Sequence, residues 1–292
     1  MTAARWPAGF WRRKPQNSNC ERFFSPGRGV TCPRAPPNMD IARSTWKELA
    51  AVMGPDSIFL LPIGSTEPHG PHLALDTDVT IARAQAERSA EVLEQAGIMA
   101  VVLPALPYGV TRFAGDFPGA ISLRPGTLWA LLEDLILTLE EVGVRRIVFC
   151  NGHLEPEHIE VIRGVVLDHS ELGPTTAQAI FPDHTRRKAA ARLSQEFQSG
   201  ECHAGEYETS IVQAVDPSAV RENARELLPP VEIGLIDGIA QGKTTFAEMG
   251  AEECYCGDPA AATAAHGEQQ LQVLASIVTD ACRVAWPDLF SS

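Results

Sequence analysis

Residues 60–78 read LLPIGSTEPHGPHLALDTD, and this stretch indicates a buried strand with a polar site at its end. The apolar run from Ile58 to Ile63 stops at a glycine, as short buried strands commonly do. The next fifteen residues contain three carboxylates and two histidines, namely Glu67, His69, His72, Asp76 and Asp78. Hard oxygen donors mixed with imidazole nitrogens form typical metal-ligand sets. The stretch therefore predicts a strand that ends in part of a metal site.

Short apolar runs alternate with longer helical patterns along the rest of the chain. Strands are predicted at residues 57–64, 99–106, 145–151 and 175–181. Helices are predicted at residues 79–96, 127–142, 156–169, 183–197, 206–215 and 260–285. Strands separated by helices of this length form βαβ units, in which helices cover both faces of a mostly parallel sheet. The predicted fold class is therefore α/β, with a mostly parallel central sheet flanked by helices.

The composition limits the domain count and the class of partner. The chain has 292 residues and shows no internal repeat or linker after residue 39, so a single domain over residues 39–292 is predicted. A net charge of −13 argues against nucleic-acid binding, and no apolar run reaches the roughly 18 residues that cross a bilayer. Seven scattered cysteines indicate reduced thiols and a cytoplasmic location. Cys254 and Cys256, spaced as C-x-C, are interpreted as ordinary cysteines because no second Cys/His pair lies nearby.

Residues 1–38 differ in character from the rest of the chain. They are rich in proline and carry seven basic residues against one acid, a net charge of +6. They have no apolar central segment, so they are not a secretory signal. A targeting extension, a disordered tail and a misassigned start remain open interpretations. The misassigned start is favoured, with Met39 as the true first residue.

A second polar cluster follows the strand predicted at residues 145–151. Residues 151–155 read NGHLE, in which the glycine allows a sharp turn after the strand. The carboxyl ends of parallel strands share one edge of a sheet, where ligands commonly bind. His153 and Glu155 are therefore expected to lie near Glu67.

A third cluster begins a predicted helix. Residues 201–210 read ECHAGEYETS and contribute His203 and Glu208, while Glu206 is interpreted as a first-turn acid of the helix. Residues 227–257 are rich in Gly and Pro and show no clear period. They are predicted to form a long loop or small subregion near the site.

Several polar side chains also have a structural interpretation. Asp76 and Asp78 lie where a helix is predicted to begin, and acids commonly cap this position. Capping is an open alternative for Asp76 and is disfavoured for Asp78, while His72 is assigned a supporting role. Asp183 and His184 form a further pair for which a structural role is favoured, although Asp183 is kept as a candidate substrate contact.

The clusters offer more ligands than one catalytic zinc ion requires, which is three side chains and a water. They are Glu67, His69, Asp78, His153, Glu155, His203 and Glu208. Two ions about 3.5–4 Å apart that share a carboxylate would use five or six of them. Nitrogen and oxygen donors without thiolates suit Zn²⁺ or Mn²⁺ and argue against a structural zinc site.

Four motifs resemble the signature of the creatininase (creatinine amidohydrolase) family. They are GSTEPHGPHLALDTD at residues 64–78, FPGAISL at 117–123, NGH at 151–153 and HAGEYETS at 203–210. The resemblance covers about residues 45–285. It implies a three-layer α/β/α fold, a dinuclear metal centre and a homo-oligomer, often a hexamer.

The resemblance also implies how the two ions are held. Glu67, Asp78 and His153 would bind one ion. His69, Asp78 and Glu208 would bind the other, so that Asp78 bridges the two.

Glu155 and His203 are the candidate catalytic residues implied by the resemblance. Glu155 would lie beside the first ion, directly or through water. A bridging hydroxide would attack an amide carbonyl, and His203 would pass a proton to the leaving nitrogen. The chain is thus expected to be a metal-dependent hydrolase of carbon–nitrogen bonds.

The expected substrate is a small amide, a cyclic amide or a short peptide. Creatinine itself is not expected, because the candidate substrate contact Leu154 stands where a creatininase has a tyrosine. Residues 175–203 also lack the tryptophan expected over creatinine. Two alternatives remain open: a lactone or C–C bond hydrolase that uses the same metal centre, and a non-catalytic binding subunit.

Overall fold

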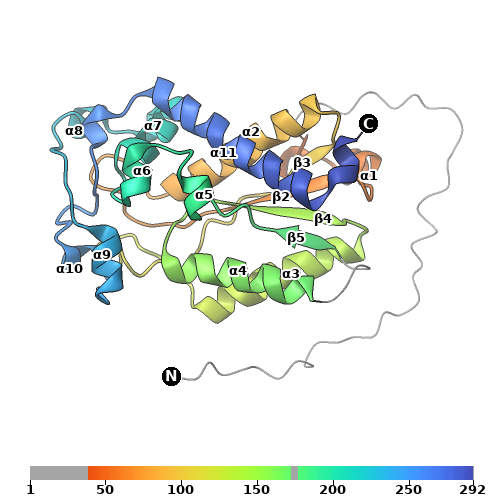
Figure 1. Ribbon diagram of the computed structural model, residues 1–292, viewed down its shortest axis with the longest axis horizontal. Coiled ribbons are helices and arrows are strands. Elements are labelled where there is room, and N and C mark those ends of the chain that lie inside the picture. Colours follow the sequence, from red (N-terminus) through yellow and green to blue (C-terminus); the bar gives the residue numbers. More distant parts are fainter. Residues whose placement is uncertain (1–38, 172–176, 292) are drawn as a thin grey trace, which may run out of the picture. The chain divides into compact units, whose positions relative to one another are not determined.

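A parallel β-sheet forms the centre of the protein (Figure 1). The computed structural model describes residues 39–171 and 177–291, so the interpretations of residues 1–38 lie outside the described residues. Within those residues the sheet has five strands, and every pairing is parallel. In spatial order they are β1 (Met39–Asp40), β3 (Ala100–Val102), β2 (Ile58–Ile63), β4 (Arg146–Asn151) and β5 (Gln178–Ile180). The predicted parallel sheet is confirmed.

The helices lie between and after the strands in the described chain. The longer ones are α1 (Trp46–Val52), α2 (Thr77–Gln95), α3 (Pro125–Glu141), α4 (Pro156–Ser170), α7 (Glu206–Val215) and α11 (Ala264–Ala285). The shorter ones are α5 (Arg187–Ala190), α6 (Gln195–Ser199), α8 (Glu222–Arg225), α9 (Leu235–Ala240) and α10 (Phe246–Met249). Single 3₁₀ turns are Ile41–Arg43, Pro217–Ala219, Pro259–Ala261 and Pro287–Phe290.

Different helices cover the two faces of the sheet, as Figure 1 shows, with α3 and α4 below it and α2 and α11 above. Side chains alternate along β2, so Phe59, Leu61 and Ile63 pack towards α3 and α4. Ile58 and Leu60 pack towards α2 and α11. Burial of a side chain of this size contributes about 1.5–3 kcal/mol, so apolar contacts stabilise both outer layers. The predicted arrangement of helices, sheet and helices is confirmed.

Two predicted helices differ from the observed ones. The helix predicted at residues 183–197 is interrupted, because the Asp183 carboxylate accepts hydrogen bonds from the Thr185 amide and hydroxyl and holds a turn there. Only α5 and α6 form in that stretch, and Ser194 caps the second. The helix predicted to begin at residue 260 begins four residues later, where the Thr263 side chain caps α11.

Three strands also differ in length or were not predicted. The strand predicted at residues 99–106 ends at Val102, and Pro104 follows soon after without an N–H to donate. The strand predicted at residues 175–181 is seen as β5, and residues 175–176 lie outside the described chain. The two-residue β1 at the sheet edge is too short to leave a periodic pattern.

The carboxyl-terminal half of the chain builds the region beside the strand ends. Helix α7 forms at the predicted residues and packs closely on α11, where a side chain at Gly267 would collide with the Ser210 backbone. Residues 227–257 carry α9 and α10 and close through a bridge between Val231 and Gly257. No helix among the described residues is both long and apolar enough for a membrane crossing.

Candidate metal centre

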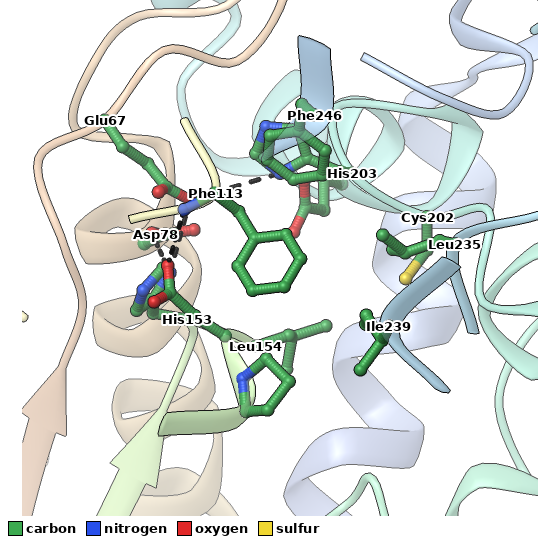
Figure 2. Close-up of a pocket in the computed structure, with 13 residues that line it drawn as sticks. Glu67, Asp78, Phe113, His153, Leu154, Cys202, His203, Leu235, Ile239 and Phe246 are labelled. Carbon is green, nitrogen blue, oxygen red and sulfur yellow. Dashed lines mark hydrogen bonds and ion pairs between the residues drawn. The ribbon is translucent and has the colours of Figure 1, made fainter. Parts of the chain in front are cut away.

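The three polar clusters meet at the carboxyl ends of β2 and β4 (Figure 2). The loop after β2 and the first turn of α2 supply one group, the turn after β4 the second, and the start of α7 the third. All seven side chains are buried: Glu67, His69, Asp78, His153, Glu155, His203 and Glu208. Their ligand atoms form three overlapping groups, in each of which the atoms lie within 4.8 Å of one another.

Asp78 lies at the centre of the cluster, between two imidazoles. Its Oδ1 lies 3.1 Å from His69 Nε2, and its Oδ2 lies 2.9 Å from His153 Nδ1. Glu67 Oε1 lies 3.2 Å from the same nitrogen of His153, and Glu208 Oε2 lies 3.6 Å from His69 Nε2. The two oxygens of one carboxylate thus face two separate sets of ligands.

Backbone carbonyls orient all three histidines in the same way. In each ring one nitrogen lies at hydrogen-bond distance from a carbonyl, to which it donates, and the other faces the carboxylates. The pairs are His69 Nδ1 with Glu67 O (3.0 Å), His153 Nε2 with Val110 O (2.7 Å), and His203 Nε2 with Pro68 O (3.0 Å). Metal-binding histidines are typically held in this manner.

The cluster contains buried polar atoms without an aligned hydrogen-bond partner among the described residues. His69 Nε2 and Asp78 Oδ2 are buried and have no aligned hydrogen-bond partner among the described residues, although charged neighbours lie close. Burying such groups without a partner is costly, and bound metal ions are one of the ways in which proteins compensate it. The donor set therefore fits a divalent ion held by nitrogen and oxygen atoms.

The cluster also perturbs the protonation of its members. Burial raises the pKa of Glu208 to about 8, although His69 opposes this. Burial opposes charge on His69, yet Asp78 and Glu208 raise the pKa of that imidazole to about 10. Burial, together with His69, lowers the pKa of His203 to about 4. The charges of the carboxylates and imidazoles thus neutralise one another only in part, which is consistent with a site that binds cations.

The loop after β3 donates hydrogen bonds that orient two of the carboxylates. The Thr111 hydroxyl donates to Glu67 Oε2, which directs Oε1 of that carboxylate towards the cluster. The amides of Arg112 and Phe113 donate to Glu155 Oε2 at 2.6 and 3.2 Å. These residues could not be predicted from the sequence, because a hydroxyl and two backbone amides leave no recognisable motif.

A cavity of about 60 Å³ opens over the cluster and is lined on its other side by apolar residues (Figure 2). The predicted substrate contact Leu154 is one of them. The others named in the figure were not predicted: Phe113, Leu235, Ile239 and Phe246. Two of these come from α9, within the segment that was expected near the site.

Residues 42–282 match the sequence profile of the family described as creatininase, creatinine amidohydrolase, and this range includes the whole cluster. The chain belongs to the creatininase family. The resemblance of the four motifs to the creatininase family is therefore confirmed. The predicted class of enzyme, a hydrolase of amide carbon–nitrogen bonds, is confirmed with it.

Individual members of the creatininase family are similar over most of their length. The chain is 29% identical to creatinine amidohydrolase of Pseudomonas putida over 270 residues, which are 85% of this chain and 97% of that protein. It is 30% identical over 261 residues to mycofactocin precursor peptide peptidase of Mycolicibacterium smegmatis, 85% of this chain and 92% of that protein. A solved structure described as “Creatininase Mn” superposes with a TM-score of 0.65 at 25% identity, covering 86% of this chain and 99% of the other.

Three other polar residues considered from the sequence lie outside the ligand groups of this creatininase-family chain. Asp183 does not line the cavity, and its carboxylate pairs with Arg163 at 2.5 Å, so the geometry gives no support to its role as a substrate contact. His72 Nε2 lies 2.9 Å from the Thr209 hydroxyl, outside the ligand groups. Asp76 is exposed at the start of α2, and its side chain makes no capping hydrogen bond.

Glu206 and the two C-x-C cysteines also lie outside the ligand groups. The Glu206 carboxylate faces His266 Nδ1 at 2.5 Å, so it belongs to the surface of α7 and not to the cluster. Cys254 and Cys256 are buried free thiols. The Cys254 sulfur lies 3.9 Å from the His203 ring nitrogen that donates to a carbonyl, so it faces the outer side of that ring.

Proposed function

We propose that this creatininase-family protein is a metal-dependent amidohydrolase with two divalent ions, Zn²⁺ or Mn²⁺, at the buried cluster. The observation that carries the proposal is the position of Asp78. Its two oxygens face different imidazoles, those of His69 and His153, so this carboxylate could be shared by two ions.

The ligands divide into two sets around that carboxylate. Glu67 and His153, with Glu155 beside them, would hold one ion, and His69 and Glu208 would hold the other. Four carboxylates lie at the cluster, namely Glu67, Asp78, Glu155 and Glu208, and in their deprotonated form they would match the charge of two divalent ions. This match supports two ions over one.

The bound ions would supply an activated water and would polarise the carbonyl under attack. The Nε2–H of His203 is occupied by the Pro68 carbonyl, which leaves Nδ1 as the acceptor on the cluster side. His203 can therefore take a proton at Nδ1 and return it to the leaving nitrogen. Glu155 keeps one oxygen fixed by two backbone amides and the other free towards the cluster. The apolar side of the cavity would limit the access of water to the reacting groups.

The proposed substrate is a small amide, a cyclic amide or a short peptide. Similarity to a creatinine amidohydrolase and to a precursor peptide peptidase supports this range. Leu154 at the cavity makes creatinine itself the less favoured member of that range. We further propose that the protein is a cytoplasmic homo-oligomer, of which a hexamer is the expected form.

The experiment is metal analysis of the purified full chain combined with a panel of amides, short peptides and lactones. We expect about two Zn²⁺ or Mn²⁺ ions per chain, loss of hydrolysis on chelation and recovery on adding metal back. A folded protein that binds neither ion would contradict the proposal. Cleavage of lactones but of no amide would favour the alternative function, a lactone hydrolase that uses the same metal centre.

A further inference from the structure

The apolar side of the cavity is a continuous surface, here called the apolar wall. It consists of Phe113, Leu154, Leu235, Ile239 and Phe246. Leu235 and Ile239 are four residues apart on α9, so they lie on one face of that helix. Phe113, Leu154, Leu235 and Ile239 are only partly buried and thus keep apolar surface free at the cavity. Figure 2 shows the wall opposite the ligand carboxylates.

Specific contacts hold the apolar wall in place. Phe246 stacks on His203, with ring centroids 4.2 Å apart and planes 19° apart. The same ring meets Phe113 edge-on at 5.9 Å, and the Phe246 amide donates to the Phe113 carbonyl at 2.8 Å. The buried Glu201 carboxylate accepts the Leu235 amide at 3.0 Å, which fixes the start of α9 beside His203. The wall and the ligands therefore form one built site.

The apolar wall has no group to receive a charged substituent. None of the described residues that line it is a lysine or arginine. The nearby Arg112 guanidinium is directed to Glu157, 3.2 Å away. The polar lining consists of Cys202 and the residues of the ligand cluster other than His69. A carboxylate or ammonium group placed against the apolar wall, opposite the ligand carboxylates, would lose water without gaining a partner, which is unfavourable.

We infer that the apolar wall is the substrate-selecting subsite, and that it takes uncharged amides with a branched aliphatic or aromatic substituent next to the scissile bond. This inference rests on the proposed function, because the wall selects only what the metal cluster cleaves. Pockets of this kind combine apolar lining with a few convergent polar groups. One additional methylene in such a pocket changes discrimination by about 10- to 200-fold.

Hydroxamates test the subsite without knowledge of the natural substrate, because their head group chelates metal ions while the substituent varies. The full chain is loaded with Zn²⁺ or Mn²⁺, and Kd is measured by calorimetry. Acetohydroxamate reports the metal centre alone. We expect 3-methylbutanohydroxamate and phenylacetohydroxamate to bind at least about 10-fold more tightly than it does. Succinic monohydroxamate and glycine hydroxamate should bind no more tightly than acetohydroxamate.

Two substitutions on α9 form a matched pair. Ile239→Ala should remove most of the apolar preference, whereas Ile236→Ala should retain it, because Ile236 is 57% exposed and does not line the cavity. Ile239→Lys should gain affinity for succinic monohydroxamate, a result that a misfolded variant would not produce.

The outcomes separate the inference from the proposed function. Equal affinity for all substituents, or tighter binding of the charged ones, would overturn the subsite while leaving the metal centre intact. Failure of the folded, metal-treated protein to bind even acetohydroxamate would overturn the metal centre and the subsite together.

Discussion

The ligand cluster and the apolar wall face each other across one cavity but are built in different ways. Each histidine of the cluster is tied to a backbone carbonyl, and its residues come mostly from the ends of β2 and β4 and the starts of α2 and α7. The wall comes from loops and from α9 and α10, helices of only six and four residues. The comparison indicates that the sheet fixes the chemistry and the peripheral segment selects the substrate.

The largest effect is expected at the centre of the cluster. Asp78→Ala removes the carboxylate shared by His69 and His153, so neither ligand set remains complete. Loss of an outer partner of a metal ligand typically costs about 10- to 100-fold in affinity or activity, and loss of the shared ligand should exceed about 100-fold. Metal content and amide hydrolysis of the purified variant provide the measurement.

Asp76→Ala is the matched control for this substitution. It removes a carboxylate two residues away, at an exposed position whose side chain makes no capping hydrogen bond. Metal content and hydrolysis should be unchanged. If both variants lost metal equally, the assignment of Asp78 as the central ligand would be wrong.

A smaller effect is expected from the outer support of the cluster. Thr111→Val removes the hydrogen bond to Glu67 with little change of shape, so metal affinity should fall by about 10- to 100-fold. Thr111→Ser should keep most of the affinity. The measurement is competition with a chelator of known affinity.

Thr66→Val provides the comparison within the neighbouring loop. Its hydroxyl donates to the Pro107 carbonyl at 2.7 Å and not to a ligand side chain. An equal loss of metal affinity in both valine variants would show that general loosening of the loops, and not the orientation of Glu67, controls the metal.

The difference between the two regions also explains what sequence could predict. The ligands combine carboxylates with histidines, which is a recognisable metal-binding pattern. Glu67, His69 and His153 also lie in motifs directly after recognisable strands. Parallel strands bring such loops to one edge, so convergence follows from topology. The family resemblance then supplied a role for each ligand, and those roles remain predictions.

The apolar wall left no comparable signal. Leu235 and Ile239 are of residue types that are common in protein cores, so they do not indicate a site. A helix of six residues is also too short to show a hydrophobic period. Phe113 and Phe246 are far apart in sequence and meet only through tertiary packing. The interrupted helix at residues 183–197 has a similar cause, because the local turn at Asp183 outweighs the helical pattern.

An effect confined to the wall is expected at Glu201. Glu201→Gln weakens the acceptor that holds the Leu235 amide, and one such hydrogen bond is worth about 0.5–1.5 kcal/mol. The Kd of 3-methylbutanohydroxamate should therefore rise by about 2- to 10-fold, with that of acetohydroxamate unchanged. The exposed Glu232→Gln on the same segment is the control and should leave both values unchanged. Equal weakening of both ligands by Glu201→Gln would mean that the wall and the cluster are not separable.

The smallest effect on hydrolysis is expected at Asp183, which belongs to neither region. Burial opposes its charge, but hydrogen bonds from Thr185 and Arg163 hold the pKa of this carboxyl below its usual range. A carboxyl with a lowered folded-state pKa stabilises the fold above its unfolded pKa, and this contribution is lost as the pH falls through the folded value. Asp183→Asn should therefore cost about 1–3 kcal/mol in the free energy of unfolding at neutral pH, less in acid, with hydroxamate affinity unchanged. Urea unfolding at several pH values provides the measurement. A variant that kept its stability but lost hydroxamate affinity would indicate that Asp183 is a substrate contact.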